Sequence, residues 1–129
     1  MRLIIVRHAK AADGEPDELR SLTGEGRAQA RALGERLRAE GEIPDAVLTS
    51  PLLRARETAT ALGLGTPEPH DALRPGATED DVREAVAGRG ETVLVVAHQP
   101  DCGRIAAALG DGAEPPFPPA GFVVLDLRS

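Results

Sequence analysis

Four basic side chains stand at or just beyond the ends of short apolar runs, where they could bind and attack a phosphoryl group. They are Arg7, His8, Arg54 and His98. Two guanidinium groups can hold a tetrahedral phosphoryl group through paired, charge-assisted hydrogen bonds and neutralise it in the transition state. A neutral imidazole nitrogen can attack phosphorus to give a phosphohistidine intermediate. A second imidazole, when protonated, can stabilise an equatorial oxygen of the same group.

The apolar runs predict the strands that must position these side chains. Short, continuous runs rich in β-branched residues are typical of buried strands, and they cover residues 3–6, 46–49, 92–97 and 122–127. Because these runs alternate with helical patterns, we predict an α/β fold, a three-layer α/β/α sandwich with a mostly parallel central sheet. Ligands of such sheets bind outside the carboxyl ends of the strands. We therefore expect the two histidines and the two arginines to converge at one edge of the sheet.

Four helices are predicted between the strands, at residues 24–40, 51–62, 79–87 and 101–109. Thr23 has the residue type of an N-cap for the first helix, and Gly41 provides a stop. Ser50 and Pro51 predict the start of the second helix, as a cap followed by a proline at the first helical position. The proline-rich segment 66–75 is predicted as a loop that a very short strand could precede.

The length and composition of the chain fit one compact domain spanning residues 1–129. Aromatic residues make up 2% of the chain and the net charge is −6, so we expect no nucleic-acid partner, because such partners favour basic surfaces and aromatic stacking. No apolar stretch reaches the roughly 20 residues of a membrane span. The opening residues lack the features of a signal peptide, and the single cysteine fits a reducing compartment. We expect a cytoplasmic monomer that does not bind membranes.

Four segments resemble, in order, the motifs of the histidine phosphatase superfamily, branch 1, whose fold is phosphoglycerate-mutase-like. LIIVRH at residues 3–8 resembles the opening strand with its RH pair, and LTGEG at 22–26 resembles the LTxxG helix start. SPLLRARET at 50–58 resembles the SPLxRAxxT segment, and VVAH at 95–98 resembles the strand that delivers the second histidine. The resemblance implies the same fold for this chain.

The resemblance also implies how the four basic residues work. It makes His8 the nucleophile and His98 a ligand of the phosphate. It makes Arg7 and Arg54 the clamps that hold the phosphate, and it implies that no metal and no cofactor is required. Lys10, two residues after the nucleophile, either adds positive potential at the mouth of the pocket, where it would help to bind substrate, or is simply an exposed lysine.

The short chain, the His-x-Pro turn at 98–100 and the tail from residue 113 onwards are similar to the SixA-type phosphohistidine phosphatases. The segments between the motifs are short, so we expect an open site that suits a phosphorylated side chain on a protein surface. The predicted function is hydrolysis of phosphohistidine proteins through a phosphohistidine intermediate on His8. A phosphatase of small phosphate esters and a phosphate-binding regulatory module without catalysis stay open as alternatives.

Four carboxylates are candidates for the proton donor to the leaving group: Asp71, Glu79, Asp80 and Asp81. A phosphohistidine substrate needs less acid assistance than an alkyl phosphate, because its imidazole can leave in the protonated form. We expect the remaining histidine, His70, to lie on the surface. We expect Cys102 to line the site or to pack beneath it.

Overall fold

The computed structural model describes residues 1–127. Its strands are β1 (Arg2–Arg7), β2 (Ala46–Thr49), β3 (Pro67–Pro69), β4 (Thr92–Ala97) and β5 (Phe122–Asp126). Its α-helices are α1 (Gly24–Ala39), α2 (Leu53–Leu62), α3 (Glu79–Val86) and α4 (Asp101–Leu109), and two 3₁₀ turns are η1 (Asp17–Leu19) and η2 (Asp71–Leu73). No helix within residues 1–127 combines the length and the apolar character needed to cross a membrane.

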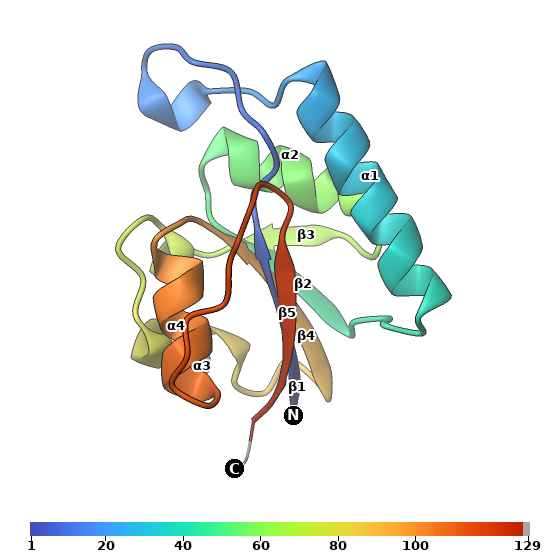
Figure 1. Cartoon of the computed structure of the whole chain (residues 1–129), viewed down its shortest axis with the longest axis vertical. Helices are drawn as coiled ribbons and strands as arrows, with labels where there is room; N and C mark the ends of the chain where they lie inside the picture. The colour runs from blue at the N-terminus through green and yellow to red at the C-terminus, as the bar shows by residue number, and fades with distance from the viewer. Residues whose placement is uncertain (128–129) are drawn as a thin grey trace.

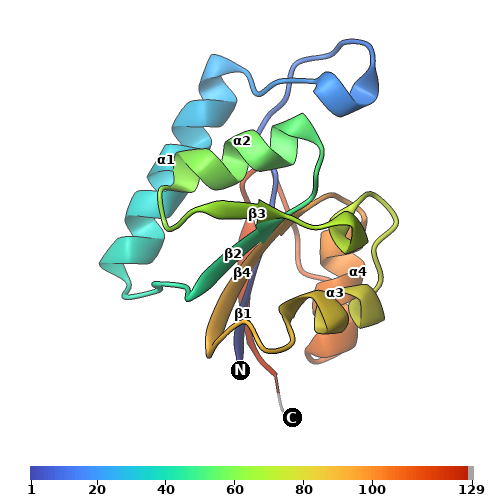
Figure 2. The same cartoon turned by 180° about the vertical axis from the view of Figure 1, so that it is seen from behind.

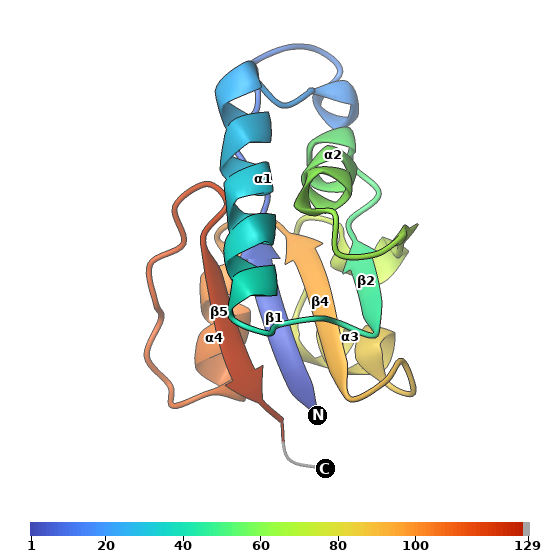
Figure 3. The same cartoon turned by 90° about the vertical axis from the view of Figure 1, so that its right-hand side faces the viewer.

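The five strands form one sheet in the order β3-β2-β4-β1-β5. Strands β3, β2, β4 and β1 run parallel to one another, and the edge strand β5 runs antiparallel to its neighbour β1. The register between β1 and β4 pairs Arg7 with Ala97. Figures 1 and 3 show β1 and β4 ending at the same edge of the sheet. The prediction of a mostly parallel sheet is confirmed.

Helices cover both faces of the sheet, because each strand sends alternate side chains into two separate cores. Leu3 and Ile5 of β1 belong to the core that α3 and α4 cover. Ile4 and Val6 belong to the core beneath α1 and α2. Figures 1 and 2 show these two helical layers on opposite sides of the sheet. The predicted three-layer α/β/α sandwich is confirmed.

Three helices start where the sequence predicts, whereas α2 starts two residues later. Thr23 caps α1 as predicted, since its side chain accepts a hydrogen bond from a backbone N–H of the first turn at 2.9 Å. The prediction that Ser50 caps α2 is wrong. The Ser50 hydroxyl oxygen lies 2.8 Å from Nε2 of His98 and accepts from the Leu52 N–H at 3.3 Å. Helix α2 therefore begins only at Leu53.

The segment predicted as a loop at 66–75 contains the edge strand β3 and the turn η2. Proline has no N–H to donate to a neighbouring strand, but it is tolerated at a sheet edge. Pro67 and Pro69 therefore do not prevent parallel pairing with β2. The sequence predicted that a short strand could precede this segment, whereas the structure has β3 within it. The local sequence does not reveal β3, because this strand forms through pairing with β2.

Candidate active site

The ends of β1 and β4 bring the two predicted site histidines together. His8 directly follows β1, His98 directly follows β4, and the two strands are neighbours in the sheet. The ring centroids lie 5.3 Å apart, with 59° between the ring planes. Arg7 is the last residue of β1, and Arg54 lies in the first turn of α2. The positive charges of both arginines lower the pKa values of both histidines, which means that the four side chains lie near one another. The four predicted residues therefore meet at one edge of the sheet.

His8 carries a proton on Nδ1 and leaves Nε2 free. Nδ1 lies 2.8 Å from the carbonyl oxygen of Ala9, which can only accept a hydrogen bond. Burial is the main reason why the pKa of His8 falls from 6.5 to about 4. The positive charges of Arg54, Arg7 and Arg20 lower this pKa further, against the raising effect of the hydrogen bond to Ala9. At neutral pH, His8 is therefore a neutral imidazole whose Nε2 lone pair is available for attack.

His98 lies deeper than His8, with 3% of its surface exposed. Its Nε2 lies 2.8 Å from the Ser50 hydroxyl, which fixes the orientation of the ring. Burial is the main reason why the pKa of His98 falls from 6.5 to about 3, and positive charge on His8 and on Arg54 lowers it further. His98 is therefore neutral at pH 7 in the free site, and the protonated ring that could stabilise an equatorial oxygen is expected only with phosphate bound. A bound phosphate dianion would favour the protonated form.

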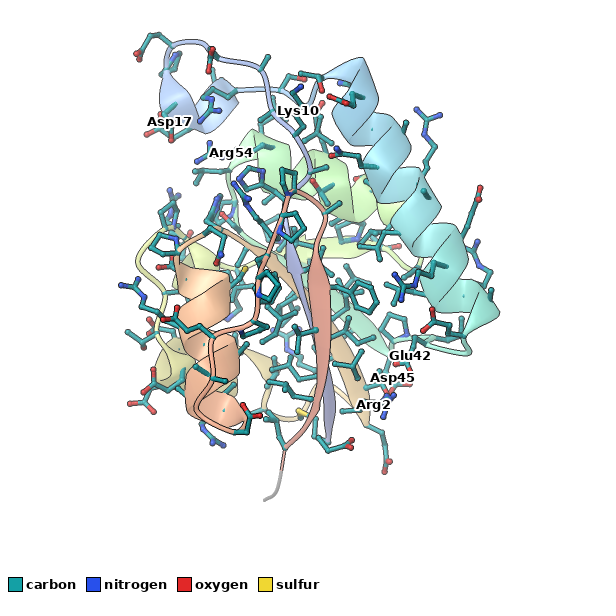
Figure 4. The ribbon with its side chains drawn as sticks, in the orientation of Figure 1. Arg2, Lys10, Asp17, Glu42, Asp45 and Arg54 are labelled. Carbon is teal, nitrogen blue, oxygen red and sulfur yellow. The ribbon has the colours of Figure 1, made fainter. Side chains whose placement is uncertain are left out.

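The two arginines are held by backbone carbonyl groups and by one carboxylate. Arg7 Nη1 donates to the carbonyl oxygen of Phe117 at 2.9 Å. Arg54 donates to the carbonyl oxygen of Asp17 at 3.0 Å and to the Asp17 carboxylate at 3.2 Å. Only 7% of the Arg54 side chain is exposed, and Figure 4 shows Asp17 beside it at the end of the molecule. The η1 segment thus covers the Arg54 side of the site, while His8 stays partly exposed.

Two buried nitrogen atoms of the site have no hydrogen-bond partner among residues 1–127, namely Arg7 Nε and His98 Nδ1. Buried polar atoms are paired in the great majority of cases. In the same part of the chain, no three His, Cys, Asp or Glu side chains are grouped to hold a metal ion. The groups that do gather here are neutral imidazoles and guanidinium cations, which suit a tetrahedral oxyanion.

Asp17 and Arg20 belong to the site, although the sequence reasoning missed them. The Asp17 carboxylate pairs with Arg20 at 3.1 Å and with Arg54 at 3.2 Å. Arg20, followed by Arg54, holds the pKa of Asp17 below its usual value, so this carboxylate is ionised at neutral pH and has no proton to donate. Both residues lie in the loop that continues from β1. The rule that ligands bind beyond the carboxyl ends of strands could have drawn attention to this loop, although no motif marks it.

Thr58 and Gly26 hold the segments of the site together. The Thr58 hydroxyl accepts from the Ala9 N–H at 2.9 Å and donates to the Arg54 carbonyl at 2.8 Å, which ties the end of β1 to α2. Gly26 lies so close to the Lys10 carbonyl that a Cβ at this position would clash with it. The threonine of the SPLxRAxxT segment and the last glycine of the LTxxG segment therefore position the residues that follow β1.

Three of the four carboxylates proposed as proton donors lie on α3, and the fourth, Asp71, lies in η2, just after β3. Asp71 pairs with Arg74 at 3.4 Å, and Asp81 accepts from the backbone N–H of Thr78 in a capping box. The remaining two, Glu79 and Asp80, are exposed in the first turn of α3. Among residues 1–127, none of the four pairs with Arg7, His8, Arg54 or His98. Figures 1 and 2 show α3 beside α4, far from the edge where β1 and β4 end.

Three further residues named from the sequence have other surroundings. The Lys10 ammonium group is half exposed and pairs with Glu25 at 2.7 Å, on the α1 side of the site (Figure 4); its part in substrate binding stays a prediction. His70 Nδ1 accepts from the Ala72 N–H at 3.1 Å, which caps η2. Cys102 packs beneath β1 in the core, where burial raises the pKa of its thiol to about 12.

Comparison with known proteins identifies the family of this chain. A model of the histidine phosphatase superfamily (branch 1) matches residues 3–75. The phosphohistidine phosphatase SixA of Escherichia coli is 32% identical over 127 residues, which cover 91% of this chain and 79% of that protein. An uncharacterized protein of Mycobacterium tuberculosis is 34% identical over 135 residues, which cover 93% of this chain and 85% of its own length.

Two solved structures of SixA proteins superpose on almost the whole of this chain. The structure of the protein histidine phosphatase SixA complexed with tungstate superposes with a TM-score of 0.88 at 28% identity and covers 98% of this chain and 88% of that one. A putative phosphohistidine phosphatase SixA from Agrobacterium tumefaciens gives a TM-score of 0.83 at 27% identity, over 97% of this chain and 90% of the other. The family model, the SixA relative and the shared fold lead to one conclusion: this chain belongs to the histidine phosphatase superfamily, branch 1, and is a histidine-dependent phosphatase.

Proposed function

We propose that this protein hydrolyses phosphohistidine on other proteins, through a phosphohistidine intermediate on its own His8. The observation that carries the proposal is the state of His8: a neutral ring, fixed through Nδ1 to the Ala9 carbonyl, with Nε2 free. Arg7, Arg54 and His98 lie near this ring and supply groups that can bind an oxyanion. The complex of SixA with tungstate, a tetrahedral oxyanion, supports the proposal that this site binds a phosphoryl group.

In the first step, His8 Nε2 attacks the phosphorus of the bound substrate. The new P–N bond forms as the bond between phosphorus and the leaving group breaks. Arg7 and Arg54 neutralise the charge of the phosphoryl oxygens, and His98 supports an equatorial oxygen. The phosphorylated ring of His8 keeps its Nδ1 proton, and the hydrogen bond to the Ala9 carbonyl stabilises the positive charge that develops on it.

In the second step, water attacks phospho-His8 and releases inorganic phosphate. The P–N bond breaks, its electron pair returns to Nε2, and the neutral ring is restored. The same arginines hold the phosphoryl group during this transfer, because the two steps have similar transition states.

The protonation state of the site favours a phosphohistidine substrate over an alkyl phosphate. Within residues 1–127, the carboxylate that pairs with Arg54 belongs to Asp17, whose pKa is lowered, mainly by Arg20, so it cannot protonate a leaving alkoxide at neutral pH. The imidazole of a phosphohistidine can leave in its protonated form and needs less acid assistance. A phosphorylated histidine of a partner protein is therefore the substrate that this set of groups serves best.

The role of His8 is tested by changing it to Asn and by making the same change at His70. His70 is the remaining histidine and caps η2. We expect His8→Asn to abolish turnover of an aryl phosphate and His70→Asn to keep it. Wild-type activity in His8→Asn would refute the assignment of the nucleophile.

The substrate class is tested by comparing kcat/KM for a phosphohistidine peptide with kcat/KM for sugar phosphates. The proposal predicts a clear preference for the peptide. A preference for sugar phosphates would instead identify the protein as a phosphatase of small esters, with the same nucleophile.

A further inference from the structure

A groove between α1 and α2 is rich in arginine. It has a volume of about 380 Å³, and its walls include Arg27 and Arg31 of α1 and Arg56 of α2. Leu53 and Ala61 of α2 add apolar surface to the groove. All of these residues lie outside the cluster around His8.

Two of the three arginines carry uncompensated charge. Arg27 pairs with Glu57 at 3.1 Å and also donates to the Leu22 carbonyl at 3.1 Å, so it has a structural role. Arg31 and Arg56 are exposed, and within residues 1–127 neither forms an ion pair or a side-chain hydrogen bond. The groove therefore keeps excess positive charge on a chain whose net charge is −6, and this charge favours a negatively charged occupant.

The groove adjoins the catalytic end of the molecule. Leu53, Arg56 and Thr60 follow helical spacing on one face of α2, while Arg54 lies on the face that reaches Asp17. Glu57, in the wall of the groove, accepts from the N–H of Leu22, directly after the loop that carries Asp17. Figure 3 shows α1 and α2 side by side at the end of the sheet where β1 and β4 stop.

We propose that this groove binds an acidic segment of the phosphorylated protein substrate. The inference rests on the proposed function and adds a recognition surface to it. Exposed arginines bind a single small anion weakly, because solvent and salt screen their charge. The acidic segment and the phosphohistidine belong to the same polypeptide. Once the phosphoryl group is bound in the site, the segment stays close to the groove, so its weak contacts increase the affinity for the substrate.

An acidic polypeptide suits this groove better than a nucleic acid does. The residues that line it include no aromatic ring on which a base could stack. Leu53 and Ala61 offer apolar contacts to the methylene groups of glutamate or to small side chains. The groove is also too small for a folded element and fits a few side chains of an extended or flexible segment.

The test compares two synthetic phosphohistidine peptides, one with a run of glutamates beside the phosphohistidine and one with glutamines in their place. The enzyme variant is Arg31→Glu/Arg56→Glu. The control, Arg74→Glu/Arg83→Glu, makes the same change in net charge at exposed positions near η2 and on α3. Turnover of an aryl phosphate, which has no acidic segment to occupy the groove, reports that each variant is folded and active.

We expect the wild type to prefer the glutamate peptide by about tenfold in kcat/KM, mainly through KM. The groove variant should lose this preference, and the control and aryl phosphate turnover should stay within about twofold of the wild type. Equal turnover of both peptides by the wild type, or a preference that survives in the groove variant, would overturn the docking proposal and leave the proposed function standing. Failure of the wild type to hydrolyse either peptide, with aryl phosphate turnover intact, would reject the phosphohistidine substrate and this inference with it.

Discussion

At His8, burial and three guanidinium groups act in the same direction. Both effects disfavour the imidazolium form, and together they lower the pKa of His8 to about 4. The hydrogen bond from Nδ1 to the Ala9 carbonyl settles which nitrogen keeps the proton. A histidine with an ordinary pKa of 6.5 would be partly protonated in the physiological range, so this environment keeps the nucleophile in its reactive form.

NMR titration of the ring protons of His8 and His98 in the free enzyme checks these pKa values. We expect both rings to stay neutral as the pH falls from 7 to about 5, since their pKa values are about 4 and about 3. Replacement of Arg20 by Gln removes a positive charge that acts on His8, so the midpoint of His8 should rise. A midpoint near 6.5 for His8 in the wild type would contradict the account of its environment.

Asp17 competes with phosphate for Arg54. Its carboxylate pairs with Arg54 and Arg20, and an incoming phosphoryl group must share or replace these contacts. We expect Asp17→Asn to bind inorganic phosphate about two- to fivefold more tightly, since the ion pair that it removes has an exposed carboxylate and a buried guanidinium group. Glu18→Gln, at the exposed neighbouring position in η1, is the control for charge. Unchanged or weaker binding by Asp17→Asn, measured by calorimetry, would show that Asp17 does not compete.

At the scale of the elements, glycine allows the close packing that puts α2 in place. A Cβ on Gly34 of α1 would clash with the carbonyl oxygen of Leu62, the last residue of α2. Because α2 carries Arg54 and Thr58, the approach of α1 to α2 also determines where these side chains lie relative to β1.

Gly34→Ala should destabilise the protein by about 1–3 kcal/mol, the usual cost of overpacking, since backbone must move to admit the methyl group. Gly24→Ala is the matched control, because a Cβ at Gly24 has no neighbour within 4 Å. Urea denaturation of both variants makes the comparison. Equal stability of the two would refute the packing role of Gly34.

The strands and helices could be predicted because their signals are local. The β-branched run of β4 and the capping threonine of α1 lie within the elements that they define. Strand β3 could not be placed in the same way, because it has two prolines in three residues and pairing with β2 forms it. The hydroxyl of Ser50 has the right type for a helix cap, but the tertiary contact with His98 uses it instead.

The predicted site residues were found because the ends of parallel strands meet at one edge of a sheet. Asp17 escaped this reasoning, because the path of a loop determines its place beside Arg54. The proton-donor candidates lie in the expected stretch of sequence, but among residues 1–127 none of them pairs with Arg7, His8, Arg54 or His98.

At the scale of the whole molecule, the two neutral histidines make stability depend on pH. Unfolding returns His8 and His98 to a pKa near 6.5, so below this pH the unfolded chain binds more protons than the folded one. The free energy of unfolding should therefore fall as the pH drops from about 6.5 toward 4, and full stability returns above 6.5. Urea titrations at several pH values measure this slope, and His8→Asn should make it shallower. An equal slope in that variant would mean that His8 is not a source of it.

The central claim is that His8 carries the phosphoryl group during turnover. Rapid mixing with a phosphohistidine peptide labelled at phosphorus, followed by an alkaline quench that preserves P–N bonds, traps the intermediate for peptide mapping by mass spectrometry. The account predicts label on His8 in the wild type and in His70→Asn, and none in His8→Asn. Label at another residue, or active enzyme in which His8 never carries label, would contradict it.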